Sequence, residues 1–152
     1  MKKLSALFLA LCLLAPCVAE IKTLEGFVYE YNLYAGIVGA EEISVSGATL
    51  NEKTKNYEFV CESGVNLWVG TDLRGGSCIA PKASVDAFLR SSAAAYFALH
   101  GTSNIIDFLG ILLYDLLLAE ESVSSKPDNL GDALISVNVY PSRYAFIFQL
   151  IG

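Results

Sequence analysis

Hydrophobic residues recur at spacings of three and four along the chain, and this periodicity predicts helices. The first predicted helix covers residues 24–43, although Phe27, Tyr29, Tyr31 and Leu33 also alternate, which leaves a strand open for its first half. The second covers residues 84–99, where Ser84 is a suitable N-cap and Asp86 lies in the first turn. Gly101 is suited to the conformation that ends a helix.

A third helix is expected to begin at Ser103 or Asn104 and to continue to about residue 121. Residues 105–118 are apolar on nearly every side apart from Asp107, Tyr114 and Asp115. Such a helix is either buried or spans a membrane. The segment is short and contains two aspartates, so we expect a buried central helix.

Beyond residue 132 the pattern changes to alternation, which is typical of strands. Residues 134–140 and 144–151 form two β-rich runs on either side of Pro141 and Ser142. This pattern predicts a β-hairpin in a tail at about residues 133–151. An isolated hairpin is marginally stable, so it must pack on the helices or on a partner.

The segment between the first two helices shows weaker patterns. Residues 44–57 are polar and are expected to form a surface loop, residues 57–69 could form a short helix or a strand, and residues 70–77 read as a turn. The sequence therefore predicts a mainly α fold, a small helical domain with a C-terminal β-hairpin. The fold would be α+β if that hairpin packs as a sheet.

Residues 1–19 have the pattern of a secretory signal peptide. Lys2 and Lys3 precede an apolar run at residues 4–14, and a small residue, Ala19, ends the segment. Cleavage there would leave one domain of 152 − 19 = 133 residues in the periplasm. Lipid attachment at Cys17 is the alternative.

Charge narrows the classes of partner. The chain has 16 acidic and 10 basic residues, and removal of Lys2 and Lys3 would change the net charge from −6 to −8. An acidic surface argues against nucleic acid and anionic lipid, and it favours a basic partner.

Two of the four cysteines, Cys61 and Cys78, would remain after cleavage. In an oxidising compartment an isolated pair is most simply a disulfide, which we expect here. With a single histidine in the chain, a zinc site would have too few ligands.

The sequence offers little for catalysis. His100 lies near a predicted helix end, where a structural role is the simpler reading. Asp107 and Asp115 would lie about 12 Å apart along a helix, too far for a carboxylate pair acting on one glycosidic bond. The segment from Gly70 to Gly76 lacks the Lys and Ser/Thr of a phosphate loop. We therefore expect no enzyme activity, cofactor, metal or small-molecule substrate.

Two pieces of the sequence, residues 34–40 and residues 78–119, carry a resemblance to a known family. Residues 78–88 read CIAPKASVDAF, residues 96–100 read YFALH and residues 116–119 read LLLA, while residues 34–40 read YAGIVGA. These pieces resemble the Rap/Tai family of periplasmic type VI secretion amidase-immunity proteins. The chain lacks the cysteines that usually flank the family's first helix and end its last one, and Gly101 stands where proline is common.

The resemblance implies an immunity protein that binds a peptidoglycan-cleaving effector and occludes its active site. The partner would be a basic secreted cell-wall hydrolase, and a homodimer is possible. Loops on a rigid scaffold often carry recognition, and Trp and Tyr dominate interface hot spots. The candidate contact residues are therefore Asn51, Lys53, Lys55, Asn56, Tyr57 and Trp68.

Two other functions remain open at this stage. One is a periplasmic stress chaperone, in which Asp107 and Asp115 would help acid to open the core. The other is an envelope-associated protein whose tail at residues 144–151 adds a strand to a partner.

Overall fold

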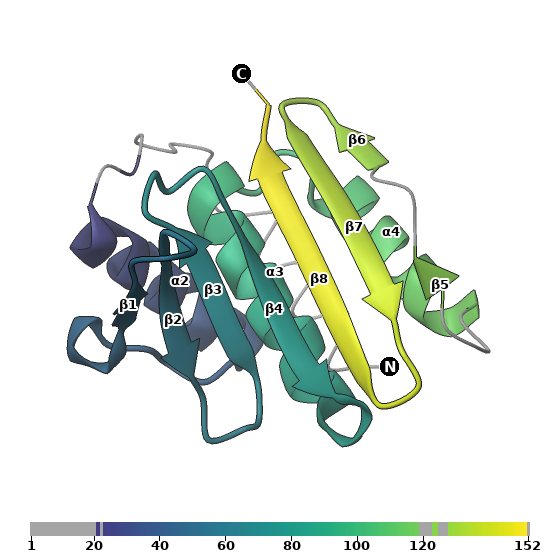
Figure 1. Ribbon diagram of the computed structural model, residues 1–152. Helices are drawn as coiled ribbons and strands as arrows, with labels where there is room; N and C mark the ends of the chain where they lie inside the picture. Colours follow the sequence, from purple (N-terminus) through teal and green to yellow (C-terminus); the bar gives the residue numbers. More distant parts are fainter. Residues whose placement is uncertain (1–20, 22, 119–122, 125–127, 152) are drawn as a thin grey trace.

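An antiparallel sheet of eight strands carries three helices on one of its faces (Figure 1). The computed structural model describes residues 21, 23–118, 123–124 and 128–151. The helices are α2 (Leu24–Val38), α3 (Val85–His100) and α4 (Ile105–Leu118), with 3-10 turns at Val45–Gly47 and Lys82–Ser84. The strands are β1 (Thr49–Asn51), β2 (Asn56–Val60), β3 (Asn66–Gly70), β4 (Gly75–Pro81), β5 (Val123–Ser124), β6 (Asp128–Leu130), β7 (Ala133–Val139) and β8 (Arg143–Leu150).

The strand order is β1-β2-β3-β4-β8-β7-β5, and β6 also pairs with β7, so β5 and β6 share the outer position. The C-terminal hairpin β7–β8 adds to the sheet because β8 pairs with β4 along seven positions. α3 lies against β4 and β8, with α2 on one side of it and α4 beside β7 (Figure 1). The opposite face of the sheet carries none of these helices.

The mainly helical fold expected from the sequence is therefore wrong, and the chain is α+β. The predicted hairpin is present, but it completes a sheet whose other half lies at residues 49–81. There the sequence alternates over only a few residues. Leu67 and Val69 of β3, and Cys78 and Ala80 of β4, point into the core, whereas their neighbours point outward. Short strands rich in Gly, Ser and Asn give a weak periodic signal, which explains the error.

The predicted helices all exist. α2 is shorter than expected because it ends at Gly39, whose left-handed conformation (φ 75°, ψ 33°) caps it. At its start Thr23 Oγ1 accepts a hydrogen bond from Gly26 N at 3.1 Å. Ser84 does precede α3, but its side chain makes no capping hydrogen bond.

The third helix is not buried at the centre. α4 lies at one end of the helix layer, with Phe108 and Leu112 in the core. Ile106 and Tyr114 on its other side are 66% and 65% exposed. The expectation failed because an apolar sequence shows that a helix can be buried, not how many neighbours cover it.

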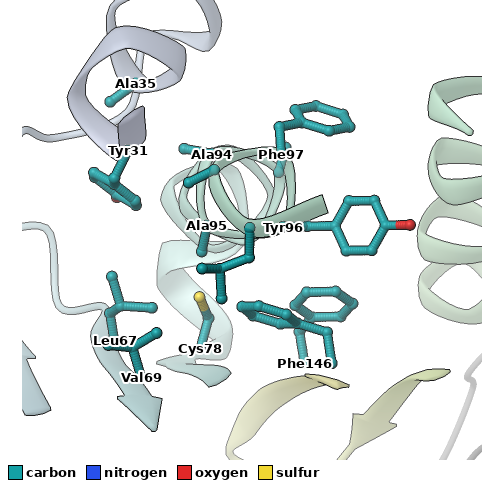
Figure 2. Close-up of a cluster of buried hydrophobic side chains, with 14 of the residues drawn as sticks. Tyr31, Ala35, Leu67, Val69, Cys78, Ala94, Ala95, Tyr96, Phe97 and Phe146 are labelled. Carbon is teal, nitrogen blue, oxygen red and sulfur yellow. The ribbon is translucent and has the colours of Figure 1, made fainter. Parts of the chain in front are cut away.

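Aromatic rings fill the space between α3, α4 and β8. Tyr96 stacks on Phe108 with the ring centroids 4.2 Å apart, and the edges of Phe146 and Phe148 meet it at 6.5 and 6.2 Å. Figure 2 shows Tyr96 reaching from α3 toward α4, with Phe146 rising from the sheet beneath it. Each such pair contributes about 0.5–1.5 kcal/mol beyond the burial of the rings.

Two glycines, one that ends α3 and one inside α2, provide a test of the assigned helices. Gly101 follows α3 with φ 72° and ψ −167°, a region essentially restricted to glycine. We expect Gly101→Ala to lower the free energy of unfolding by about 1–3 kcal/mol. In contrast, a Cβ at Gly36 on α2 would meet no side chain within 4 Å among the described residues. Gly36→Ala should therefore raise the free energy of unfolding by about 0.5–1 kcal/mol. Urea denaturation measures both changes, and equal effects would contradict the assigned helix ends.

Candidate functional site

The candidate contact residues lie in and around the hairpin of β1 and β2. Asn51 pairs with Asn56 across the two strands, and its side-chain amide donates to Glu58 Oε1 at 2.9 Å. Its Oδ1 accepts hydrogen bonds from the Lys53 and Thr54 backbone N–H groups, both at 3.2 Å. The polar segment is thus an ordered hairpin and not the surface loop that its composition suggested.

The structure does not bring all six candidates to one surface. Lys53 and Lys55 are exposed at the hairpin turn, where Lys55 pairs with Glu52 at 2.9 Å. Tyr57 packs against the core on the helix side of β2. Trp68 belongs to the opposite face, where it lines a hollow of about 300 Å³ together with Asn56.

The expected disulfide is absent, because Cys61 and Cys78 are buried free thiols. Cys61 directly follows β2 and Cys78 lies in β4, so β3 runs between them and Leu67 is the register partner of Cys78. Two strand spacings are roughly 9–10 Å. That separation exceeds the Cα distance of about 4.4–6.8 Å that a disulfide requires.

Burial also makes both thiols unreactive. It raises the pKa of Cys61 to about 11 and that of Cys78 to about 12, the latter against the opposing influence of Ser92. Both groups are therefore protonated at neutral pH, and the protonated thiol is a poor nucleophile.

A carboxylate of the loop after α2 holds the turn between β2 and β3. Glu41 accepts hydrogen bonds from the backbone N–H groups of Glu62 and Ser63 at 2.8 and 2.9 Å. Burial acts to raise the pKa of Glu41, but these hydrogen bonds outweigh it and the pKa is lowered. This carboxylate therefore has a structural position and remains charged.

His100 is part of the aromatic core. Its ring stacks on Tyr96 at 4.6 Å and meets the edge of Phe148 at 5.9 Å. Burial lowers its pKa to about 4, although Asp132 acts in the opposite direction. Within the described residues no three His, Cys, Asp or Glu side chains gather into a metal site. Nor is any helix there long and apolar enough to cross a membrane.

α2 has an exposed surface that its sequence pattern did not predict. Tyr29 and Leu33 lie one turn apart on the side away from the core, and they are 69% and 46% exposed. Glu25 lies one turn before Tyr29, and Glu30 flanks the pair. We call these four residues the acidic face of α2. In the sequence, Tyr29 and Leu33 are large apolar residues that fall outside the face formed by Leu24, Phe27, Val28, Tyr31, Tyr34 and Val38.

No family model, curated protein or solved structure matches this chain. The resemblance to the immunity family therefore stays a prediction, and the function is argued from the surfaces of the molecule.

The thiols provide a direct test of the buried cysteine positions. In the chain without residues 1–19, we expect Cys61 and Cys78 to resist Ellman's reagent in the native state and to react once the protein is unfolded. The intact mass should show both cysteines reduced. Rapid labelling of the native protein, or a peptide in which Cys61 is linked to Cys78, would contradict the structure.

His100 makes stability depend on pH. Its pKa is about 4 in the folded protein and about 6.5 in the unfolded chain, so the unfolded chain binds more protons between these values. The stability is therefore complete above pH 6.5 and decreases as the pH falls toward 4. Thermal melts of His100→Phe should lack this part of the decrease, while the part due to carboxylates stays. An identical pH profile for the variant and the parent protein would show that His100 is not buried as described.

Proposed function

We propose that the protein is an exported, non-catalytic binding protein that captures a basic protein partner on the acidic face of α2. The observation that carries the proposal is the exposure of Tyr29 beside Leu33 among carboxylates. The 15 residues of α2 include no Lys or Arg that could neutralise Glu25 and Glu30 internally.

The two kinds of side chain on this face have different effects on binding. Tyr29 and Leu33 supply apolar area that a partner can bury, and tyrosine is among the residues that most often dominate binding energy. Glu25 and Glu30 attract a basic partner and accelerate encounter, as does the net charge, which is −6 for the full chain and −8 without residues 1–19. Glu42 is also exposed, just beyond the end of the helix.

The partner to test first is a basic cell-wall hydrolase. Support comes from the signal-peptide pattern of residues 1–19 and from the resemblance of residues 78–88 to immunity proteins. Both are sequence arguments, and the helical fold that the resemblance implied is not the fold of this chain. Binding would inhibit the hydrolase stoichiometrically by covering its active site.

A second candidate function is an acid-activated chaperone, and His100 is the observation that favours it. Protonation of this ring near pH 4 would loosen the packing of α3 on α4 and expose apolar surface. Client binding that arises only in acid, with no affinity for a basic hydrolase at neutral pH, would favour this alternative.

Charge reversal tests the proposed function. We expect the double variant Glu25→Lys, Glu30→Lys to weaken binding to a purified basic peptidoglycan amidase at least tenfold, about 1.4 kcal/mol, mainly through slower association. Tyr29→Ala should weaken binding by a similar or larger factor, through faster dissociation. Surface plasmon resonance separates the two rates, and co-expression in the periplasm reports rescue from lysis.

A matched control carries the same change in net charge on the other side of α3. The variant Asp107→Lys, Asp128→Lys alters α4 and β6 and should bind almost as the parent protein does. Equal weakening by both double variants would show that only net charge matters. Failure of every basic hydrolase tested to bind would refute the proposed partner class.

A further inference from the structure

A hollow of about 300 Å³ lies on the face of the sheet opposite the three helices (Figure 1). It follows β4 between β3 and β8, because Ser77 of β4 has Trp68 of β3 and Ile147 of β8 as its register partners, and all three line it. The turn between β3 and β4, which contains Asp72 and Arg74, bounds one end. The hollow therefore has one aromatic wall, one aliphatic wall and a charged end.

We propose that this hollow binds a neutral sugar of one or two pyranose rings and does not cleave it. A pyranose has C–H groups on its flat faces, which pack on an indole ring, and hydroxyl groups around its rim, which pair with polar side chains. Small-ligand sites measure about 300–1,000 Å³, so a hollow at the lower end of that range suits a ligand of this size. The inference does not rest on the partner captured on α2.

Small residues keep the floor of the hollow low beside the aromatic wall. Ser77, the register partner of Trp68 on β4, is too short to cover the indole ring. A Cβ at Gly75 would lie 2.5 Å from the Phe148 carbonyl oxygen and 3.0 Å from the Gln149 Cα, so a larger residue would require β8 to move. The indole thus keeps a side on which a ligand ring can pack.

Polar side chains lie around the aromatic wall. Asn56, Arg74 and Gln149 line the hollow, and within the described part of the chain no hydrogen bond or ion pair engages their side chains. Asp72 Oδ1 accepts a hydrogen bond from the Arg74 backbone N–H at 3.1 Å, which holds the carboxylate over Gly70. Amide, carboxylate and guanidinium groups each present two polar atoms in one plane, and neighbouring hydroxyls of a sugar match that spacing.

The charges of the hollow favour a neutral ligand. Asp72 and Arg74 are the two charged residues that line it, and their charges are opposite. A phosphate or another anion would meet the Asp72 carboxylate, and it would approach a chain whose net charge is already −6. A cation would instead meet Arg74. A ligand without net charge uses both side chains as hydrogen-bond partners and is repelled by neither.

The lining predicts binding without turnover. Most glycoside hydrolases cleave the glycosidic bond with a pair of carboxyl groups. Among the described residues that line the hollow, Asp72 supplies the one carboxylate. Glu58, the register partner of Trp68 on β2, is not part of the lining and accepts a hydrogen bond from the Asn51 amide at 2.9 Å. A bound sugar is therefore released unchanged, and the hollow serves recognition.

The hollow and the acidic face of α2 belong to opposite sides of the molecule. The helices cover one face of the sheet, and the hollow lies on the other (Figure 1). A protein partner on α2 and a sugar in the hollow can therefore be bound at the same time, and each site can be abolished separately.

Trp68 is the single tryptophan of the chain, so its fluorescence reports directly on the hollow. The purified protein is titrated with cellobiose, maltose, lactose and N,N′-diacetylchitobiose. We expect at least one of these sugars to shift the Trp68 emission to shorter wavelength and to protect it from acrylamide, with saturation. Inorganic phosphate and glycylglycine should produce no saturable change. Isothermal titration calorimetry measures the affinity without relying on Trp68.

Ser77→Leu fills the hollow and leaves Trp68 in place, so it should weaken sugar binding at least tenfold in calorimetry. Ser136→Leu is the matched control, because Ser136 is the register partner of Ile147 on β7 and does not line the hollow. This control should bind the sugar as the parent protein does. Circular dichroism checks that the variants are folded, and Trp68→Ala, which should also weaken binding at least tenfold, replaces Ser77→Leu if the latter is not.

Several outcomes would overturn the proposal. They are the absence of saturable binding for all four sugars, sugar binding that survives both Ser77→Leu and Trp68→Ala, and tighter binding of phosphate or glycylglycine than of any sugar. Sugar binding without affinity for a basic hydrolase would refute the capture on α2 alone. Hydrolase binding without sugar binding would refute the sugar site alone.

Discussion

The packing of α3 on the inner face of the sheet is the contact on which the rest of the structure depends. Every residue from 91 to 99 of this helix is buried. Its small residues, Ala93 to Ala95, let neighbouring elements approach, while Tyr96 joins it to α4 through Phe108 and to β8 through Phe146. A helix this thoroughly covered positions α2 and α4 on either side of it. Both flanking helices therefore lie on the same face of the sheet as α3.

That one-sided arrangement determines which surfaces are free for the proposed recognition. The helices use their apolar stripes to cover the inner face, and only their outer sides remain for recognition. On α2 this outer side has Tyr29 and Leu33 beside carboxylates, which suits a basic partner. The uncovered face of the sheet instead has Trp68 at the edge of a hollow that Asp72 and Arg74 also line. A single constraint on packing thus produces two surfaces of different chemistry.

Sequence reasoning identified the parts of the fold that have a strong period. The helices were found because their apolar residues recur over several turns, and β7 and β8 because they alternate over seven and eight residues. Strands β1 and β4 were missed, and residues 57–69, which hold most of β2 and β3, were left open between a short helix and a strand, since glycine, serine and asparagine interrupt the alternation. The disulfide was wrong because sequence separation does not reveal that β3 runs between Cys61 and Cys78. Trp68 and Tyr57 were both singled out as binding residues by their chemistry. Tyr57 is the register partner of Val69 and faces the core with it, whereas Trp68 is one position earlier on β3 and faces the other side of the sheet.

The central claim is that recognition takes place on the outer side of α2, and side-chain footprinting of a complex measures this directly. Hydroxyl-radical oxidation of Tyr29 and Leu33 should be strong in the free protein and should drop on binding a basic cell-wall hydrolase. Ile106 and Tyr114 on α4 are as exposed as Tyr29, and their oxidation should not change. Equal oxidation of Tyr29 in the free and the bound protein would contradict the account.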